Sequence, residues 1–269
     1  MSGFSADWLA LREPFDSRAR SPAVLDAVAS FFEHQPSVGV IDLACGTGST
    51  LRALSPRLPP RQSWTLVDND PKLLARAAST PTSRDVTVTV VARDLSDDLE
   101  PALTGAVDLV ATSALLDLVS DAWLHRVMIA VAARPIPFYA ALSYDGRVAF
   151  TPSDPFDAAV VGAVNAHQLT DKGFGAALGP AAADVALSRF PALGYAVVRG
   201  ASDWQMERED RDMQNALVDG WARAARDIGT LSGQDIAGWL TRRHAAIAAG
   251  RSSLLVGHVD FFAVPSATR

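Results

Sequence analysis

The stretch VIDLACGTGSTLRAL, residues 40–54, decides the fold because it reads as a buried strand, a glycine-rich turn and a helix in direct succession. The apolar, β-branched run at residues 38–44 is typical of a parallel strand covered on both faces. Gly46 and Gly48 lie where a chain turns tightly or approaches a ligand closely. The helix that follows begins with free backbone N–H groups. The stretch therefore predicts a ligand site beyond the carboxyl end of a strand.

The turn departs from two other glycine-rich nucleotide motifs. A dinucleotide fingerprint requires a third glycine three residues after Gly48, and that position is Leu51. A phosphate-binding loop requires Gly-Lys-Ser/Thr, which the turn lacks. A nicotinamide oxidoreductase and a P-loop enzyme are both disfavoured.

Strand and helix signals alternate outward from this stretch. Further strands are expected at 64–68, 86–92, 107–112 and 137–143, with helices between them, which predicts a doubly wound α/β sheet. The second half adds strands at 196–199 and 254–264, the last two of the sheet, separated by amphipathic helices at 209–227 and 234–249. The expected organisation is an N-terminal helical segment over 1–36 and one domain over 37–269, with a helical lid or insert at about 205–250.

Three carboxylates are expected at one edge of this sheet. Asp42, Asp68 and Asp94 lie at or just after the ends of three successive strands. Ligands of open α/β sheets bind beyond the carboxyl ends of the strands, and a carboxylate about twenty residues after the turn can accept hydrogen bonds from ribose hydroxyls. The alternative for Asp68 is a strand-end cap, and the alternative for Asp94 is a purely structural role.

Four segments together resemble a known family. Residues 40–54, LVDNDPKLL (66–74), VVARDL (90–95) and VDLVATSALLDLVSD (107–121) look like the successive motifs of class I S-adenosylmethionine-dependent methyltransferases. The resemblance covers about the first half of the chain. It implies a Rossmann-like, seven-stranded, mostly parallel sheet with one reversed strand, helices on both faces, S-adenosyl-L-methionine as cofactor and methyl transfer as activity.

The resemblance also implies roles at the methionine end of the cofactor. Asp42 and the backbone from Gly46 to Gly48 would hold the methionine moiety, and Ala44 lies in the same turn. Ser113, after the fourth strand, would line the methionine and methyl side.

At the adenosine end, Asp68 would bind the ribose, with Asn69 beside the adenine. Asp94 would accept from the adenine amino group, and the Leu95 N–H would meet the ring.

The candidates on the acceptor side carry an alternative each. Asp117 is interpreted as a catalytic base or a helix cap, and His167 as a general base or part of a solvated loop. Lys172 would hold an acidic substrate or face water. Tyr144 and Asp145 would bind substrate, or else form a simple Tyr-Asp-Gly turn.

The N-terminal segment supplies one further candidate. Arg12 would pair with the cofactor carboxylate, since arginine binds carboxylates in a bidentate manner. The alternative is a helix that merely docks on the sheet.

The composition limits the classes of partner expected for this protein. A net charge of −6 without a basic stripe argues against nucleic acid, and no stretch is apolar enough to span a membrane. One cysteine and no signal peptide favour a cytoplasmic protein, and the scattered histidines predict no metal site. We therefore expect a small-molecule acceptor that is methylated on oxygen, nitrogen or carbon. The alternatives are a methyltransferase acting on protein or RNA, and a non-catalytic module that binds S-adenosylmethionine. Oligomeric state stays open.

Overall fold

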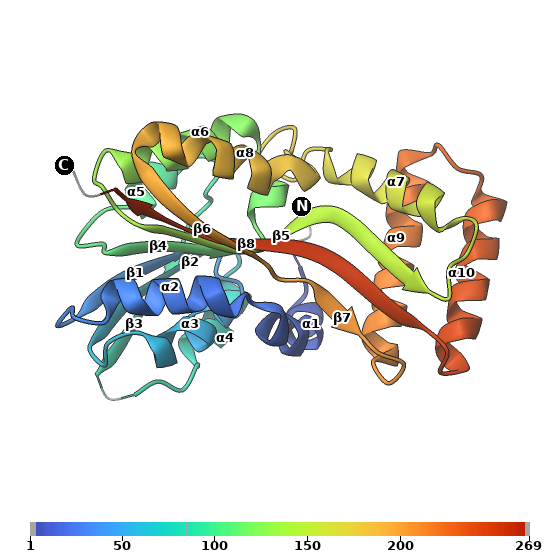
Figure 1. The fold of residues 1–269 in the computed structure, drawn as a ribbon, viewed down its shortest axis with the longest axis horizontal. Coiled ribbons are helices and arrows are strands. Elements are labelled where there is room, and N and C mark those ends of the chain that lie inside the picture. Colours follow the sequence, from blue (N-terminus) through green and yellow to red (C-terminus); the bar gives the residue numbers. More distant parts are fainter. Residues whose placement is uncertain (1–3, 84, 267–269) are drawn as a thin grey trace.

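A single eight-stranded sheet runs through the molecule, with helices on both faces (Figure 1). The computed structural model describes residues 4–83 and 85–266. The strand order is β3-β2-β1-β4-β5-β8-β6, and β7 pairs with β8 beside this path. The strands are β1 (Val38–Leu43), β2 (Gln62–Asp68), β3 (Val86–Ala92), β4 (Leu109–Ser113), β5 (Phe138–Thr151), β6 (Tyr195–Ala201), β7 (Trp204–Met206) and β8 (Ser253–Pro265).

The helices form a layer on each side of the sheet. In Figure 1, α2, α3 and α4 lie below the sheet, and α5, α6 and α8 lie above it. Short 3-10 turns complete the connections. The α-helices are α1 (Ala6–Ala19), α2 (Pro22–Phe32), α3 (Ser49–Leu54), α4 (Pro71–Ala78), α5 (Leu99–Ala102), α6 (Asp121–Ala132), α7 (Asp157–Gln168), α8 (Ala182–Arg189), α9 (Arg211–Ile228) and α10 (Gly233–Ala248).

The predicted fold class is confirmed, with one correction to the strand count. β1 to β5 pair in parallel, and β8 runs antiparallel to β5, β6 and β7, so it is the one reversed strand. The expectation of seven strands is wrong because β7 adds an eighth. Three residues are too few to show an alternating pattern, so β7 carries no recognisable strand signal.

β5 is also longer than expected. It continues to Thr151, well beyond the predicted end at residue 143, and its pairing with β8 shifts register twice, between Ala140 and Ser143 and between Tyr144 and Val148. Such irregularities bend a strand and redirect its side chains. The Tyr-Asp-Gly segment at residues 144–146 lies in the second of these shifts. It reads as a turn in the sequence, yet it continues the strand.

The far ends of β5 and β8, with β7, support a separate group of helices. Figure 1 shows α7, α9 and α10 at this end, away from the layers that cover the parallel strands. These helices bury their own apolar cluster, which includes Val160, Ile236 and Trp239. The Trp239 indole donates to Asp157 Oδ1 at 2.9 Å, which joins α10 to α7. The division into segments 1–36 and 37–269 stays a prediction, and residues 1–3 and 267–269 lie outside the described part.

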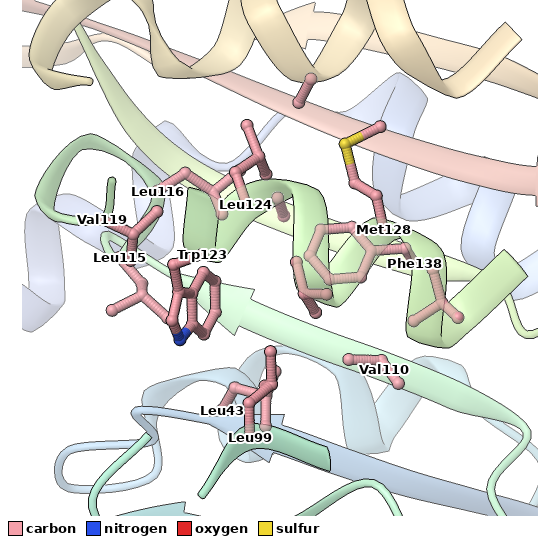
Figure 2. Close-up of a cluster of buried hydrophobic side chains, with 14 of the residues drawn as sticks. Leu43, Leu99, Val110, Leu115, Leu116, Val119, Trp123, Leu124, Met128 and Phe138 are labelled. Atoms are coloured by element: carbon pink, nitrogen blue, oxygen red, sulfur yellow. The ribbon is translucent and has the colours of Figure 1, made fainter. Parts of the chain in front are cut away.

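The hydrophobic core above the sheet holds the loop that follows β3. Trp123 and Met128 of α6 pack with Phe138 of β5 and Leu43 of β1 in one buried cluster (Figure 2). The Trp123 Nε1–H donates to the Leu95 carbonyl at 2.7 Å. Because this bond joins α6 to the loop after β3, the core holds that loop in a defined position.

Candidate active site

A cavity of about 520 Å³ lies beyond the carboxyl ends of the parallel strands. Its volume is within the usual range for small-molecule and cofactor sites. Segments that follow β1, β2, β3 and β4 contribute to it, together with α1. The structure brings nine of the predicted site residues to its wall: Arg12, Ala44, Gly46, Asp68, Asn69, Asp94, Leu95, Ser113 and Lys172.

The turn after β1 has a backbone that requires glycine. Gly46 has φ +55° and Gly48 has φ +85°, and a Cβ on Gly46 would lie 3.2 Å from Leu9 Cδ1. Ala44 also has a positive φ, of 54°, which is uncommon for a residue with a side chain. Gly48 is the N-cap of α3 and does not line the cavity. The turn thus presents backbone to the cavity instead of side chains.

Asp68 is held by two backbone N–H groups. Its Oδ2 accepts from Gly46 N at 2.8 Å, and its Oδ1 accepts from Asp70 N at 3.0 Å. Burial raises the pKa of Asp68, against the opposing effect of these N–H groups. Each oxygen retains a second lone pair, so the fixed carboxylate can still accept hydrogen bonds from a ligand.

The rim of the cavity carries two exposed polar residues. Asn69 follows β2, and Asp94 follows β3. Asp94 Oδ1 accepts from Ser96 N at 2.9 Å and from Ser96 Oγ at 2.8 Å. Leu95 is buried beside it, and its carbonyl accepts the Trp123 hydrogen bond described above. One carboxylate oxygen of Asp94 makes no side-chain or backbone bond in the described residues and can receive a ligand N–H.

Asp42 lies beneath the cavity instead of on its wall. It is fully buried, and neither carboxylate oxygen has a hydrogen-bond partner among the described residues. Burial raises its pKa to about 7, partly opposed by the charge of Arg20. An orphaned buried carboxylate is costly and is often found at functional sites.

Arg20 is a residue that the sequence reasoning missed. It is buried and donates to Tyr139 Oη at 3.0 Å and to Ser113 Oγ at 3.2 Å. It thereby holds Ser113 at the cavity and places a positive charge near Asp42. No spacing in the sequence singles out an arginine at the end of an N-terminal helix, so nothing there indicated this role.

Helix α1 closes the cavity from the N-terminal side. Arg12 forms a buried, bidentate pair with Asp16, at 2.9 and 3.2 Å. Asp16 also accepts from Trp204 Nε1 at 3.0 Å, which connects α1 to β7. On the opposite side Glu13 pairs with Arg52, whose Nη1 donates to the Thr47 carbonyl at 2.6 Å. The helix is therefore tied both to the glycine turn and to β7.

A second cavity of about 420 Å³ adjoins the first. Phe4, Arg12, Ala114 and Leu118 line both. The second cavity is enclosed by α1, the segment after β4, and residues of β5, α7, β7, α9 and β8. Its walls are strongly aromatic, with five large rings: Phe4, Trp8, Tyr144, Trp204 and Trp221.

Asp117 lines the second cavity and is buried. Its Oδ2 accepts from Gln168 Nε2 at 3.3 Å, and its Oδ1 has no partner among the described residues. Burial raises the pKa of Asp117 to about 6, against the charges of Arg12 and Lys172 and nearby backbone N–H groups. A carboxylate with this pKa is a better proton acceptor near neutrality than an exposed one.

His258 is another residue that sequence reasoning did not select. It lies on β8, lines the second cavity and packs against the Trp204 ring, with centroids 4.7 Å apart. Its Nδ1 is 3.0 Å from the Val256 carbonyl. Burial, followed by the charge of Arg12, lowers the pKa of His258 to about 3, so the ring is neutral. In the sequence His258 is one of several scattered histidines.

Besides Asp42 and Gly48, two residues predicted for catalysis or substrate binding, His167 and Asp145, line neither cavity. His167 Nδ1 contacts Lys172 Nζ at 3.1 Å, and His167 Nε2 lies 3.8 Å from Asp227 Oδ2. Burial lowers the pKa of His167. Asp145 accepts from Arg147 N at 3.0 Å and Nε at 2.7 Å, so it serves the bend in β5. Lys172, expected to hold substrate, lies on the wall of the first cavity and not of the second.

Over residues 4–83 and 85–266, no three His, Cys, Asp or Glu side chains are grouped so as to hold a metal ion. Within the same residues, no helix combines the length and hydrophobicity needed to cross a bilayer.

Comparison with known proteins gives a family for part of the chain and a likeness for all of it. Residues 40–134 match a family model described as a methyltransferase domain. No curated protein matches the chain. Among solved structures, a cyclopropane-fatty-acyl-phospholipid synthase-like protein from Lactobacillus casei ATCC 334 is 16% identical, with a TM-score of 0.51, covering 97% of this chain and 94% of that one.

A second solved structure is a SAM-dependent methyltransferase from Geobacter sulfurreducens in complex with S-adenosyl-L-homocysteine. It is 16% identical, with a TM-score of 0.46, and the match covers 98% of this chain and 100% of that one. The likeness to the Lactobacillus casei protein, at 16% identity, concerns the fold alone. The family match lies over β1 to α6, the segment that carries the glycine turn and the carboxylates of the first cavity. Residues 40–134 therefore match a methyltransferase domain, which is consistent with the resemblance to class I S-adenosylmethionine-dependent methyltransferases.

Proposed function

We propose that this methyltransferase acts on a small molecule that binds in the second cavity, with S-adenosyl-L-methionine in the first. The observation that carries the proposal is the shared wall between the two cavities, formed by Phe4, Arg12, Ala114 and Leu118. Two ligands that meet across this wall can bring a methyl group and an acceptor atom together. The catalytic task is then chiefly alignment and exclusion of water.

The residues of the first cavity fit the cofactor. Asp68 retains lone pairs for the two ribose hydroxyls, and the free oxygen of Asp94 can accept from the adenine amino group. We propose Asn69 and the Leu95 N–H as neighbours of the adenine. The open backbone at Gly46 leaves room for a close approach, which a Cβ would fill.

The methionine end would be held from the opposite side. Arg12 uses Nε and Nη2 for Asp16, which leaves Nη1 for the cofactor carboxylate. Ala44 and Ser113 line this end, and Arg20 positions Ser113. The orphaned carboxylate of Asp42 gives a negative field beneath the turn, which favours the positively charged amino and sulfonium groups. When bound, S-adenosylmethionine supplies an electrophilic methyl group.

The second cavity supports a small acceptor over a protein or an RNA. It is lined by elements from both halves of the chain, α1 and α9 among them, and its volume of about 420 Å³ suits a small molecule. The predicted lid at residues 205–250 corresponds to the segment from β7 to α10, and we retain it as a proposal, as we do a cytoplasmic location.

Titration calorimetry with S-adenosylmethionine and S-adenosylhomocysteine tests the cofactor half of the proposal. We expect both to bind, and Asp68→Ala to weaken both. Absence of binding by either would overturn it. Incubation with methyl-labelled cofactor and a fractionated metabolite extract tests the acceptor half, and label found only in macromolecules would refute a small acceptor.

A further inference from the structure

Several polar side chains of the second cavity offer it lone pairs. His258 shows this most clearly. A carbonyl oxygen can only accept, so the 3.0 Å contact with Val256 O requires the proton to be on Nδ1. The ring is neutral because burial and the charge of Arg12 lower its pKa. Its other nitrogen, Nε2, therefore carries a lone pair.

Tyr144 and Gln168 follow the same pattern. The Asn165 amide donates to the Gly146 carbonyl at 3.2 Å, which orients its Oδ1 toward Tyr144. Tyr144 Oη donates to that oxygen at 2.8 Å, so its own hydrogen is used. Gln168 uses its amide nitrogen on Asp117 Oδ2, at 3.3 Å. What remains on Tyr144 for a ligand is an acceptor oxygen, and Gln168 keeps its Oε1 and one N–H.

Two strong donors nearby already have a partner. Arg12 gives two nitrogens to Asp16, and Trp204 Nε1 donates to the same carboxylate. Asp117 differs, because its Oδ1 is buried without a partner among the described residues. The cavity thus contains one unpaired carboxylate and several neutral acceptors inside aromatic walls.

We propose that the second cavity takes an amine with a flat apolar body, and that its nitrogen is the atom methylated; this inference rests on the proposed function. An ammonium group has several N–H donors for these acceptors, whereas a hydroxyl has one. Trp and Tyr faces attract cations, and a carboxylate completes the recognition. A carboxylate-bearing acceptor head group would meet Asp117 and lone pairs, which repel it.

The reaction balances on the residues present. The ammonium nitrogen gives a proton to Asp117 Oδ1, leaving a neutral amine with a free lone pair. Burial favours this transfer because it disfavours both charged groups, the ammonium of the acceptor and the carboxylate of Asp117. The bond from nitrogen to the methyl carbon then forms as the carbon–sulfur bond breaks, and its electron pair stays on sulfur. The proton on Asp117 leaves to solvent with product release.

The charges around Asp117 come from several elements. Arg12 approaches from α1 and is paired, Lys172 lies after α7 on the wall of the first cavity, and His258 of β8 is neutral. The exposed Arg223 of α9 lines the second cavity and lies at its solvent side. These surroundings leave Asp117 as the carboxylate that faces the acceptor without an ion-pair partner among the described residues.

The test compares three probes that share one body: 2-phenylethylamine, 2-phenylethanol and phenylacetic acid. For binding, each probe is titrated into the full chain preloaded with S-adenosylhomocysteine. In a separate reaction without S-adenosylhomocysteine, transfer of label from S-adenosylmethionine to each probe is measured. We expect the amine to bind at least about tenfold more tightly than the alcohol or the acid, since a hydrogen bond to a charged group accounts for such a factor. Label should appear on nitrogen.

Asp117→Asn keeps the shape of the side chain and removes the charge. It should weaken amine binding by about tenfold to a hundredfold and leave S-adenosylhomocysteine affinity unchanged, which also shows that the variant folds. Asp184→Asn, on the exposed face of α8 and away from both cavities, is the matched control and should change neither.

Different results would overturn the amine inference and the proposed function. If S-adenosylhomocysteine binds but the alcohol or acid equals the amine, or no amine binds, the amine inference is overturned and the proposed function stands. If S-adenosylhomocysteine does not bind, the proposed function fails and the inference fails with it.

Discussion

The buried carboxylate of Asp42 makes the stability of the cofactor-free protein depend on pH. Its pKa rises from 3.8 to about 7 on folding, so the folded chain holds the proton more tightly than the unfolded chain. The resulting stabilisation is complete below pH 3.8 and is lost as the pH rises to about 7. A shift of this size corresponds to roughly 4 kcal/mol, of which about 3 kcal/mol falls between pH 5 and pH 8.

Asp42→Asn removes the titrating group and keeps its shape. The free energy of unfolding of the variant, minus that of the wild type, should therefore increase by about 3 kcal/mol from pH 5 to pH 8. For a chain of this size the equivalent gain in melting temperature at pH 8 is about 6 °C relative to pH 5. The slope with pH is the informative quantity, because the asparagine amide adds a desolvation cost that does not change with pH.

The assay is urea unfolding without cofactor at several pH values between 5 and 8, followed by tryptophan fluorescence. Asp260, another buried carboxylate with a raised pKa, contributes to both proteins and cancels in the difference. Asp184→Asn, at an exposed position, should give a flat difference. A flat or declining difference for Asp42→Asn would refute the assignment of a buried, unpaired charge.

Three further predictions concern the site. Gly46→Ala should lower stability by about 1–2 kcal/mol and weaken S-adenosylhomocysteine binding in calorimetry, because φ is +55° and the new Cβ meets Leu9; unchanged affinity would contradict the close-approach argument. Trp123→Phe should cost about 1–3 kcal/mol in urea unfolding, since the buried Leu95 carbonyl loses its donor, and a loss below this range would indicate that water replaces it. The rate of methyl transfer should rise with pH through about 6 as Asp117 ionises, and Asp117→Asn should abolish this limb and lower kcat by about 10²–10⁴; a pH-independent rate in the wild type would exclude Asp117 as the base.

The cofactor side of the protein could be predicted from local sequence. The strand and turn at residues 40–54 combine apolar β-branched residues with glycines at the positive-φ positions Gly46 and Gly48. Such local patterns specify local backbone geometry, and parallel strands necessarily end at one sheet edge. Asp68 and Asp94 were found for this reason. Asp42 was selected too, but its burial below the cavity depends on the packing above and below β1.

The acceptor side could be predicted only in part. Asp117 and Tyr144 were selected because they follow strands. Asp145 was selected by the same reasoning, and His167 as a possible base in a glycine-rich segment, yet both lie away from the two cavities. The sequence reads the segment after residue 143 as a turn, and the register shifts that carry β5 onward are set by its pairing with β8. Pairing between distant strands has no signature in either strand alone.

The sequence by itself determined the α/β fold, the glycine turn and the row of carboxylates, because these depend on residues close together along the chain. Only the tertiary structure decided the second cavity, which joins α1 near the N-terminus to β8 near the C-terminus. It also decided which polar groups there are donors or acceptors, since the state of His258 and the unpaired oxygen of Asp117 follow from burial and from partners far away in sequence. Burial and pairing are properties of the assembled chain, and they set the chemistry that the acceptor meets.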